Sequence, residues 1–377
     1  MTGMAALPAG APPDVARRLD GAIAADSSIC LLSAADNRLA YRGYDVAELA
    51  RRATYEETAF LLLQGRLPDR AALREFTRQL RAAQRLPREL VTFLRRLPPA
   101  FDPMAVLRTA VSGLGLGLQD TPPLAAATGL VAQFPTLVAA MHRVRQGERP
   151  LTPKRGLGLA AGFLYLLHGR EAEPELVRAF DAALTLRADN EFNPSTFAAR
   201  VAAATRADVH GCVTAALAAL AGPQHGGHSL GAYRLLEEIR TIDRVEAVVA
   251  ERLAGSGVPA FGHPVYREDP RTPPMREASA AACEVARCGE WFGLARAVEE
   301  RVRAVTGKFP NVDFYLAPLF KALQIPPELF TPVFAVGRMS GWAAHILEQY
   351  GQPGLIRPRA AYVGPEREEF RPLARRR

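Results

Sequence analysis

Residues 222–227 read Gly-Pro-Gln-His-Gly-Gly, and this short break separates two segments with helical periodicity. The preceding segment is rich in alanine, which permits close approach of helices inside a bundle. The following segment begins near His228. Apolar residues recur at helical spacing, with Pro or Gly near the ends, in Asp45 to Gln64, Arg70 to Gln84, Ser195 to Ala221 and Pro332 to Tyr350. The sequence therefore predicts an all-α fold.

Alternating strand patterns are nearly absent from the chain. One hairpin is predicted, with Ser28 to Leu32 paired to Arg38 to Tyr41 across a turn at residues 35–37. Breaks at 97–99 and 143–155 are predicted surface connections. The stretch from His263 to Pro274 contains motif residues, so we expect a functional loop there.

The composition indicates a soluble globular protein. The 377 residues allow one large domain or two unequal ones, and 49% are hydrophobic. The longest apolar stretch, roughly 157–167, is too short to span a bilayer and suits a buried helix. Residues 1–15 lack a charged start followed by an apolar block, so no secretory signal is expected. We expect a cytoplasmic protein with no membrane partner.

The chain is basic, with a formal charge of +8, and only three of its 47 basic residues are lysines. No helix-turn-helix, RNA-binding or zinc-finger signature accompanies this charge, so nucleic acid is not an expected partner. Arginine forks match carboxylates and phosphates, which favours small anionic substrates. Residues 374–377 are interpreted as a solvated basic tail.

The four cysteines are scattered. Cys283 and Cys288 are five residues apart in a helical pattern, which predicts different helix faces and neither a bridge nor a metal pair. We expect buried thiols in a reducing compartment.

His225 lies between Gly-Pro and Gly-Gly, just before a predicted helix. The N-terminus of a helix disfavours a protonated imidazole, and a neutral one can donate a hydrogen bond to a carbonyl oxygen. An isolated histidine is more often a core or capping residue, but the two glycines permit close approach of backbone or ligand. His228 completes an HxxH spacing without a further ligand nearby, so no metal site is expected.

Two more stretches carry candidate chemistry. Residues 262–271 include His263 and, within Asp-Pro-Arg, Arg271, while residues 311–315 read Asn-Val-Asp-Phe-Tyr. Asp313, between Val and Phe, is either a helix N-cap or a general base whose basicity partial desolvation increases. Two histidines and an aspartate suit proton transfer next to a carbonyl.

Arginines complete the candidate set. Arg338 heads a helical stripe with Trp342 and His345, at offsets of four and seven. Arg357 lies in Arg-Pro-Arg at the start of an extended tail, where a solvated tail is the simpler interpretation. With Arg271, these arginines could hold two carboxylates by bidentate pairing.

Together and in this order, these motifs resemble the citrate synthase family. The resemblance covers roughly residues 19–365. Its further matches are residues 19–21, Tyr41 to Tyr44, Ala59 to Pro68, Pro103 to Ser112, Asn193 with 195–196 and 198–200, 330–332, Gly341-Trp342 with His345, and 357–359.

The resemblance implies a helical fold of two domains and a homodimer. Residues 19–224 with 335–365 would form the large domain, and 225–334 a smaller mobile one. Residues 1–18 would be a flexible N-terminus and 366–377 a basic tail. The implied reaction joins an acyl-CoA to a 2-oxo acid and then hydrolyses the thioester, with no metal or other cofactor.

The resemblance also assigns roles to residues of this chain. Asp313 would remove a proton from the acyl methyl group, His225 would stabilise the enol(ate), and His263 would polarise the keto group. The other implied contacts are Arg271, Arg338 and Arg357 (from the neighbouring subunit), Asn190, Asn193 and Ser195 to the oxo acid, and Lys308 and Arg267 to CoA.

Several positions depart from the family pattern. Arg187-Ala188-Asp189-Asn190 stands where His-Ala-Asp-His is usual, and Asn190 cannot carry the positive charge of the second histidine. The other departures are His228-Ser229-Leu230 after the glycines, Pro264 where Arg is common, a loop from 263 to 271 one residue shorter, and Asp102 where histidine is frequent.

Three functions remain open from the sequence. The first is an acyl-CoA:2-oxo acid C-acyltransferase of the citrate synthase type in the tricarboxylic acid cycle, using acetyl-CoA and oxaloacetate by default. The second is a 2-methylcitrate synthase using propionyl-CoA, because one methylene is worth only about 1–3 kcal/mol in a pocket. The third is a non-catalytic paralogue with a changed oxo-acid pocket, which Arg187, Asn190 and His228 favour and the retained His225, His263 and Asp313 oppose.

Overall fold

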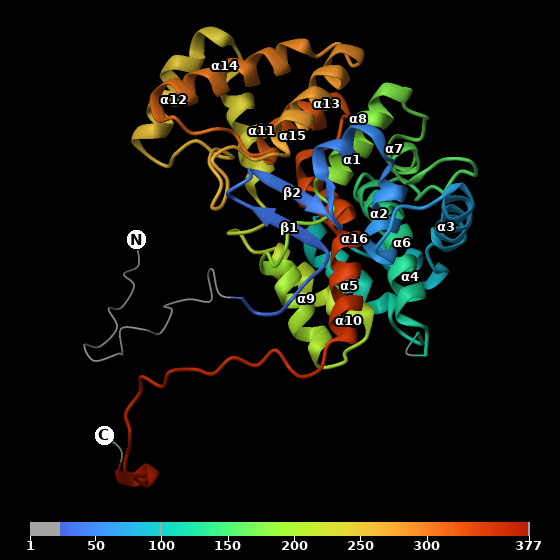
Figure 1. The fold of residues 1–377 in the computed structure, drawn as a ribbon, viewed down its shortest axis with the longest axis vertical. Coiled ribbons are helices and arrows are strands. Elements are labelled where there is room, and N and C mark those ends of the chain that lie inside the picture. Colours follow the sequence, from blue (N-terminus) through green and yellow to red (C-terminus); the bar gives the residue numbers. More distant parts are fainter. Residues whose placement is uncertain (1–22, 99, 119, 376–377) are drawn as a thin grey trace. The chain divides into compact units, whose positions relative to one another are not determined.

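The computed structural model describes residues 23–98, 100–118 and 120–375 of the chain (Figure 1). The chain divides into two units. One unit is residues 27–354, which contain the core and the candidate site. The described part of the other is residues 23–26 and 355–375, whose one regular element is the 3-10 helix η3 (Leu373–Arg375).

The described residues are mostly helical, which confirms the all-α prediction. The α-helices are α1 (Val46–Arg52), α2 (Tyr55–Gln64), α3 (Arg70–Ala83), α4 (Arg88–Arg95), α5 (Pro103–Leu114), α6 (Pro123–Arg145), α7 (Leu159–His168), α8 (Pro174–Leu186), α9 (Pro194–Ala204), α10 (Val209–Leu220), α11 (His228–Ile239), α12 (Val245–Ala254), α13 (Thr272–Val285), α14 (Gly289–Thr306), α15 (Val312–Ala322) and α16 (Phe330–Gly351). Two 3-10 turns, η1 (Ile242–Arg244) and η2 (Pro327–Leu329), connect them.

The predicted hairpin is present. Strand β1 (Cys30–Ser33) pairs antiparallel with β2 (Arg38–Tyr41), with Cys30 opposite Tyr41. A two-residue strand, β3 (Tyr44–Asp45), adds a second antiparallel partner to β2. The first strand begins two residues later and ends one residue later than the sequence predicted.

Two of the predicted helices are broken, and a cap residue explains each break. Within 45–64, Thr54 starts α2 by a capping box, in which its side chain and that of Glu57 each accept a backbone N–H of the other. Within 195–221, the chain turns at Arg206, which has a φ of +66°, and Asp208 then caps α10 by accepting from the N–H of Gly211. The predicted single helices were wrong at these points.

The prediction that the longest apolar stretch lies at 157–167 was also wrong. Helix α6 is the one helix in the described part of the chain that is long and apolar enough to cross a membrane. Of its most apolar window, 78% is buried inside the protein, as in the core helix of a globular protein. The stretch 157–167 forms the shorter α7, which is largely buried, as predicted.

Helix α16 organises the core of the larger unit (red in Figure 1). It packs against α2, α6, α8, α9 and α10. A Cβ atom added at Gly341 would lie 2.1 Å from the carbonyl oxygen of Ala188, so only glycine permits this approach of α16 to the chain that follows α8. That chain, residues 187–193, leads directly into the candidate site.

Helices α11 to α15 pack mainly on one another (yellow to orange in Figure 1), and α13 and α15 also contact α8. This group lies within the small domain, 225–334, that the resemblance implies. The C-terminal boundary of that domain falls inside the continuous helix α16. The division into two domains stays a prediction.

All four cysteines are free, and Cys212, Cys283 and Cys288 are buried. The prediction that Cys283 and Cys288 occupy different faces of one helix was wrong, because α13 ends at Val285 and Cys288 precedes α14. The N–H of Cys288 donates to the carbonyl of Cys283 at 2.9 Å, so the two residues are neighbours across a turn.

Candidate active site

His225 lies in the turn between α10 and α11. Its N–H donates to the carbonyl of Gly222 at 3.0 Å. A Cβ atom at Gly226 would lie 2.4 Å from the carbonyl oxygen of Leu220, so the glycine after His225 is needed for close backbone packing. The hydroxyl of Thr331, from the first turn of α16, donates to the carbonyl of Gly226 at 2.9 Å. The turn is therefore held from both sides.

Contacts with α9 orient the His225 ring. Its Nε2 lies 2.8 Å from Oγ of Ser195 and accepts the backbone N–H of the same serine at 3.3 Å. Oγ of Ser195 also lies 2.8 Å from Oδ1 of Asn193 and accepts the indole N–H of Trp342 at 3.2 Å. The edge of the His225 ring meets Phe334, with 6.1 Å between ring centroids.

These bonds assign the tautomer of His225. Because Nε2 accepts a backbone N–H, the proton of the neutral ring lies on Nδ1. Burial first, and then the positive charge of Arg338, lower the pKa of His225 to about 4. The imidazole is neutral at pH 7, and its Nδ1–H is a donor.

His263 also presents a neutral ring. Its Nδ1 accepts the backbone N–H groups of Val265 and Tyr266, each at 3.2 Å, so its proton lies on Nε2. Burial, with the neighbouring Arg271, lowers the pKa of His263. The loop predicted over 263–274 ends at Arg271, because α13 begins at Thr272.

Asp313 lies in the first turn of α15 and is not its cap. Asn311 is the N-cap, accepting the N–H of Asp313 at 3.0 Å, and its amide donates to the carbonyl of Gly262 at 3.1 Å. The second of these bonds joins the loop of His263 to the helix of Asp313. The side chain of Asp313 is 17% exposed, and one carboxylate oxygen lies 2.7 Å from a guanidinium nitrogen of Arg187.

Arg271 is buried and paired. Its Nε and Nη2 donate to the two carboxylate oxygens of Asp269, each at 2.9 Å. Burial acts to lower the pKa of Arg271, but the Asp269 carboxylate outweighs it, and the pKa is raised. Asp269 also accepts the N–H of Val312 at 3.0 Å, which ties Arg271 to the start of α15.

Arg338, Trp342 and His345 form the predicted stripe on α16, and each is at most 2% exposed. Nε of Arg338 donates to the carbonyl of Arg187 at 2.7 Å. His345 accepts from Arg200 at Nδ1, at 3.0 Å, so its Nε2–H donates to Asp189 at 3.2 Å. The guanidinium of Arg338 is thus inside a packed interface, as the spacing predicts.

The remaining predicted residues occupy three places. Asn193 caps α9, and Asn190 is half-buried just before it, with a buried Oδ1 that has no hydrogen-bond partner among the described residues. Lys308 and Arg267 are exposed, with the Arg267 guanidinium 5.9 Å from the ring centre of Phe309. Arg357 is exposed in the segment 355–375, and its role stays a prediction.

Sequence reasoning did not place three residues that line this site. Arg187, noted only as a departure, contacts Asp313. The guanidinium groups of Arg187 and Arg338 both lie over the ring of Phe334, at 4.1 and 4.7 Å from its centroid. Arg303 lies 4.3 Å from the centre of the Phe309 ring, beside Lys308 and Arg267. The contact of Arg187 with Asp313 joins residues far apart in the chain, so periodicity carries no signal of it. Phe334 lies four residues before Arg338 on α16, and this spacing could have placed it on the predicted stripe.

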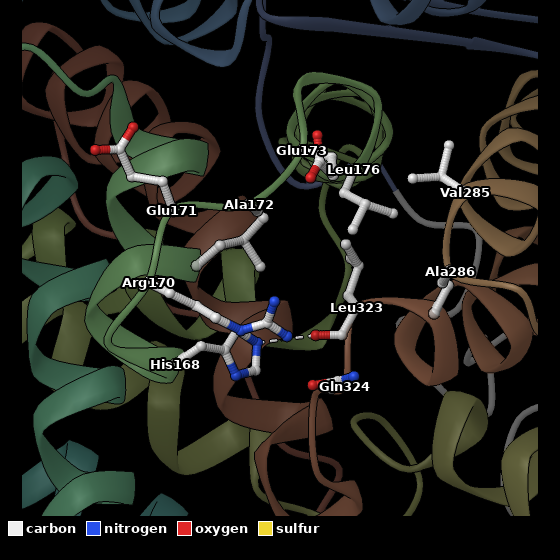
Figure 2. Close-up of a pocket in the computed structure, with 12 residues that line it drawn as sticks. His168, Arg170, Glu171, Ala172, Glu173, Leu176, Val285, Ala286, Leu323 and Gln324 are labelled. Atoms are coloured by element: carbon white, nitrogen blue, oxygen red, sulfur yellow. Dashed lines mark hydrogen bonds between the residues drawn. The ribbon is translucent and has the colours of Figure 1, made fainter.

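A separate pocket, of about 190 Å³, lies between α7, α8 and the C-terminal ends of α13 and α15 (Figure 2). None of the predicted site residues lines it. Figure 2 shows its histidine, His168, bonded to the carbonyl of Leu323, at 2.9 Å. Burial lowers the pKa of His168. We place the candidate active site at the motif residues because they bring two neutral imidazoles, a carboxylate and buried guanidiniums together.

Comparisons with known proteins identify the family of the chain. Residues 18–359 match the family model described as citrate synthase, C-terminal domain. The chain is 41% identical to citrate synthase 2 of Bacillus subtilis, over 96% of this chain and 99% of the relative. It is 37% identical to a 2-methylcitrate synthase of Mycobacterium tuberculosis, over 94% and 92% of the two chains.

A solved structure has the same fold. Citrate synthase of Thermoplasma acidophilum, in a ternary complex with carboxymethyl coenzyme A and oxaloacetate, superposes with a TM-score of 0.87. It is 27% identical, and the match covers 95% of this chain and 99% of that one. The family model alone spans most of the described residues, and the chain therefore belongs to the citrate synthase family.

Proposed function

We propose that this protein condenses acetyl-CoA with a 2-oxo acid, oxaloacetate by default, and releases citrate and CoA. The observation that carries the proposal is the neutral His225, with its proton on Nδ1, in one buried site with Asp313 and the arginines Arg271 and Arg338. A weakly acidic C–H next to a carbonyl needs this combination of a base and a donor.

The proposed first step is enolisation. Asp313 removes a proton from the methyl carbon of the acetyl group, and the Nδ1–H of His225 donates to the thioester oxygen, where negative charge develops. A donor positioned at a developing oxyanion is worth about 10²–10³ in rate. The bonds from Ser195 hold the ring of His225 in this orientation before substrate binds.

The proposed second step is carbon–carbon bond formation. The enol(ate) carbon attacks the keto carbon of the oxo acid while Nε2–H of His263 donates a hydrogen bond to the keto oxygen. The alkoxide that forms takes up the proton that Asp313 removed in the first step, which returns Asp313 to its carboxylate form. Arg271 and Arg338 bind the carboxylates, and we expect Arg357 of a second copy to complete the site in a homodimer. Water then cleaves the thioester, with the acyl carbon taking the hydroxyl and the CoA sulfur taking the proton.

For CoA, the proposal uses the basic residues around Phe309. Arg267 and Arg303 both lie over its ring, and Lys308 precedes it. Three positive side chains around one ring, two from loops and one from α14, suit the phosphates of CoA. We expect the reaction to use no metal or other cofactor. We also expect the protein to be cytoplasmic.

A second candidate is 2-methylcitrate synthase activity with propionyl-CoA, which the relative from Mycobacterium tuberculosis supports by its name. A third is a non-catalytic paralogue, which the contact of Arg187 with Asp313 supports, because a carboxylate paired with a guanidinium is not free to approach an acyl methyl group.

Thiol release tests the three candidates. Purified protein would be given acetyl-CoA or propionyl-CoA, each with and without oxaloacetate, and free thiol would be measured. Release that depends on oxaloacetate supports a synthase, and the ratio of kcat/KM for the two thioesters chooses between the first two candidates. No release with either thioester contradicts both.

A further inference from the structure

Arg187 is the least satisfied buried cation in the candidate site. The residue is 5% exposed, and its Nε and Nη1 have no hydrogen-bond partner among the described residues. Nη1 lies 2.7 Å from Oδ1 of Asp313, but the N–H bonds do not point at that oxygen, which is also without a hydrogen bond. The contact is an ion pair without hydrogen-bond alignment.

The surroundings of Arg187 concentrate positive charge. Its guanidinium and that of Arg338 share the ring of Phe334, and its carbonyl oxygen accepts from Nε of Arg338. Burial first lowers the pKa of Arg187, and Asp313 opposes this while Arg338 and Arg271 add to it, giving about 10. The guanidiniums of Arg187, Arg338 and Arg271 repel one another, and Arg187 has N–H groups without a hydrogen-bond partner among the described residues. Such a group of cations is suited to binding an anion.

The neighbouring position 190 lacks a charge. Asn190 has a buried Oδ1 without a partner among the described residues, and an amide contributes no net charge to an anion. Within residues 187–190, positive charge is therefore supplied by Arg187 and not by position 190. Glutamine, lysine or histidine at position 187 would change that charge or its fork geometry.

We propose that Arg187 binds a carboxylate of the 2-oxo acid, and that Asp313 occupies this guanidinium until the carboxylate arrives. The proposal rests on the proposed function and adds a specificity: a second carboxylate on the acceptor is recognised through Arg187. Arrival of the acceptor then loosens the hold on Asp313, the base of the proposed reaction. A 2-oxo acid with a single carboxylate gains little from Arg187.

The direct test is binding of oxaloacetate and pyruvate, measured by calorimetry without acyl-CoA. We expect Arg187→Gln to weaken oxaloacetate binding about 10- to 100-fold, the value of one charge-assisted hydrogen-bonded contact, and to leave pyruvate binding within a few fold. Arg187→Lys should restore part of the loss. An unchanged ratio of the two affinities in Arg187→Gln overturns the proposal.

The matched control is Arg178, which lies in α8, the helix that directly precedes Arg187. Arg178 donates to the carbonyls of Ala53 and Ala50, at 2.8 and 3.2 Å, and neither acceptor belongs to the candidate site. Arg178→Gln should leave both affinities unchanged. A loss of oxaloacetate affinity equal to that of Arg187→Gln would mean that the effect follows from disturbing this part of the fold, and would overturn the proposal.

A second arm tests the competition with Asp313. Asp313→Asn should strengthen oxaloacetate binding. The gain should be larger in the wild-type background than in Arg187→Gln, because only the wild type has a guanidinium at position 187 that the change frees from its pairing with Asp313. Equal strengthening in both backgrounds overturns the competition. If Arg187→Gln does not fold, the same comparison is made with Arg187→Lys, whose point charge should show a smaller gain.

The outcomes separate this proposal from the proposed function. Wild-type protein that binds oxaloacetate through Arg187 but releases no thiol contradicts the function and supports the role of Arg187. Oxaloacetate-dependent thiol release with no change in binding for Arg187→Gln supports the function and overturns the role of Arg187. Wild-type protein that binds neither oxo acid overturns both.

Discussion

The hydroxyl oxygen of Ser195 lies 2.8 Å from Nε2 of His225, although thirty residues separate them in the chain. The same oxygen accepts the indole N–H of Trp342, from α16. Two helices, α9 and α16, and the turn that contains His225 therefore meet at one atom, and the contacts with Ser195 determine which nitrogen of His225 carries a proton. The orientation of this imidazole follows from the packing of the helices, and no ligand is needed to set it.

The role of Asp313 is testable by a nearly isosteric change. Asp313→Asn removes the only proton acceptor that the proposed enolisation uses, and we expect thiol release to fall by at least about 10²–10⁴-fold. Circular dichroism and the increase in Tm on adding oxaloacetate should show a retained fold and retained binding. Turnover equal to that of the wild type would remove Asp313 from the mechanism.

The lowered pKa of His225 predicts a pH dependence of stability. Folded protein keeps His225 neutral down to about pH 4, whereas the unfolded chain takes up a proton near pH 6.5. Protonation thus favours unfolding between these values, by up to about 3 kcal/mol, and the stability is fully present above about pH 6.5.

The His225→Gln variant should not show this decrease in stability as the pH falls. Unfolding in urea at a series of pH values would give the free energy of unfolding of both proteins, and the wild-type value minus the variant value should decrease from pH 6.5 to 4. The comparison isolates His225, because other shifted groups, such as Asp181 with its pKa raised to about 7 by burial, are common to both. A difference that does not vary with pH would contradict a buried neutral ring.

Asn190 offers a test of acceptor choice. If this residue is the cause of an altered oxo-acid pocket, Asn190→His should raise kcat/KM for oxaloacetate, by roughly tenfold for one added charged hydrogen bond. Steady-state thiol release at varied oxaloacetate measures it. No improvement, or a loss, would mean that the shape of the pocket depends on asparagine and that its positive charge comes from another residue.

Gly341 tests the packing that supports the site. A methyl group there would lie 2.1 Å from the carbonyl oxygen of Ala188 and 2.6 Å from a carboxylate oxygen of Asp189. Gly341→Ala should therefore lower the free energy of unfolding by about 1–3 kcal/mol, despite the better helix propensity of alanine. Chemical denaturation measures the loss. As a control, Gly129, inside α6 with no atom near its Cβ position, should accept alanine without such a cost.

Much of the fold follows from local patterns in the sequence. Apolar spacing predicts α3 and α16 within one or two residues of their ends, and turn residues at 35–37 predict the hairpin. The break before α2 was also visible in principle, since Thr54 and Glu57 have the spacing of a capping box. The break before α10 is harder, because Arg206 adopts a positive φ that its residue type does not favour.

The candidate site is predictable in its residues but not in its contacts. Motif spacing and family resemblance pointed to His225, His263 and Asp313, and the structure brings their loops together. The pair of Arg187 with Asp313 spans 126 positions and depends on how α8 meets α15. A local pattern contains no information about such a tertiary contact, so Arg187 could be noted only as a departure from the usual sequence.

The continuity of α16 restricts how this chain can change in length. Arg338, Trp342 and His345 all project from that one helix, at intervals of four and three residues. Inserting or deleting a single residue between them would rotate everything beyond it by about 100° and turn one part of the set away from the other. Homologous sequences should therefore tolerate gaps in the connection at 146–158, between α6 and α7, while α16 keeps a constant length between its site residues.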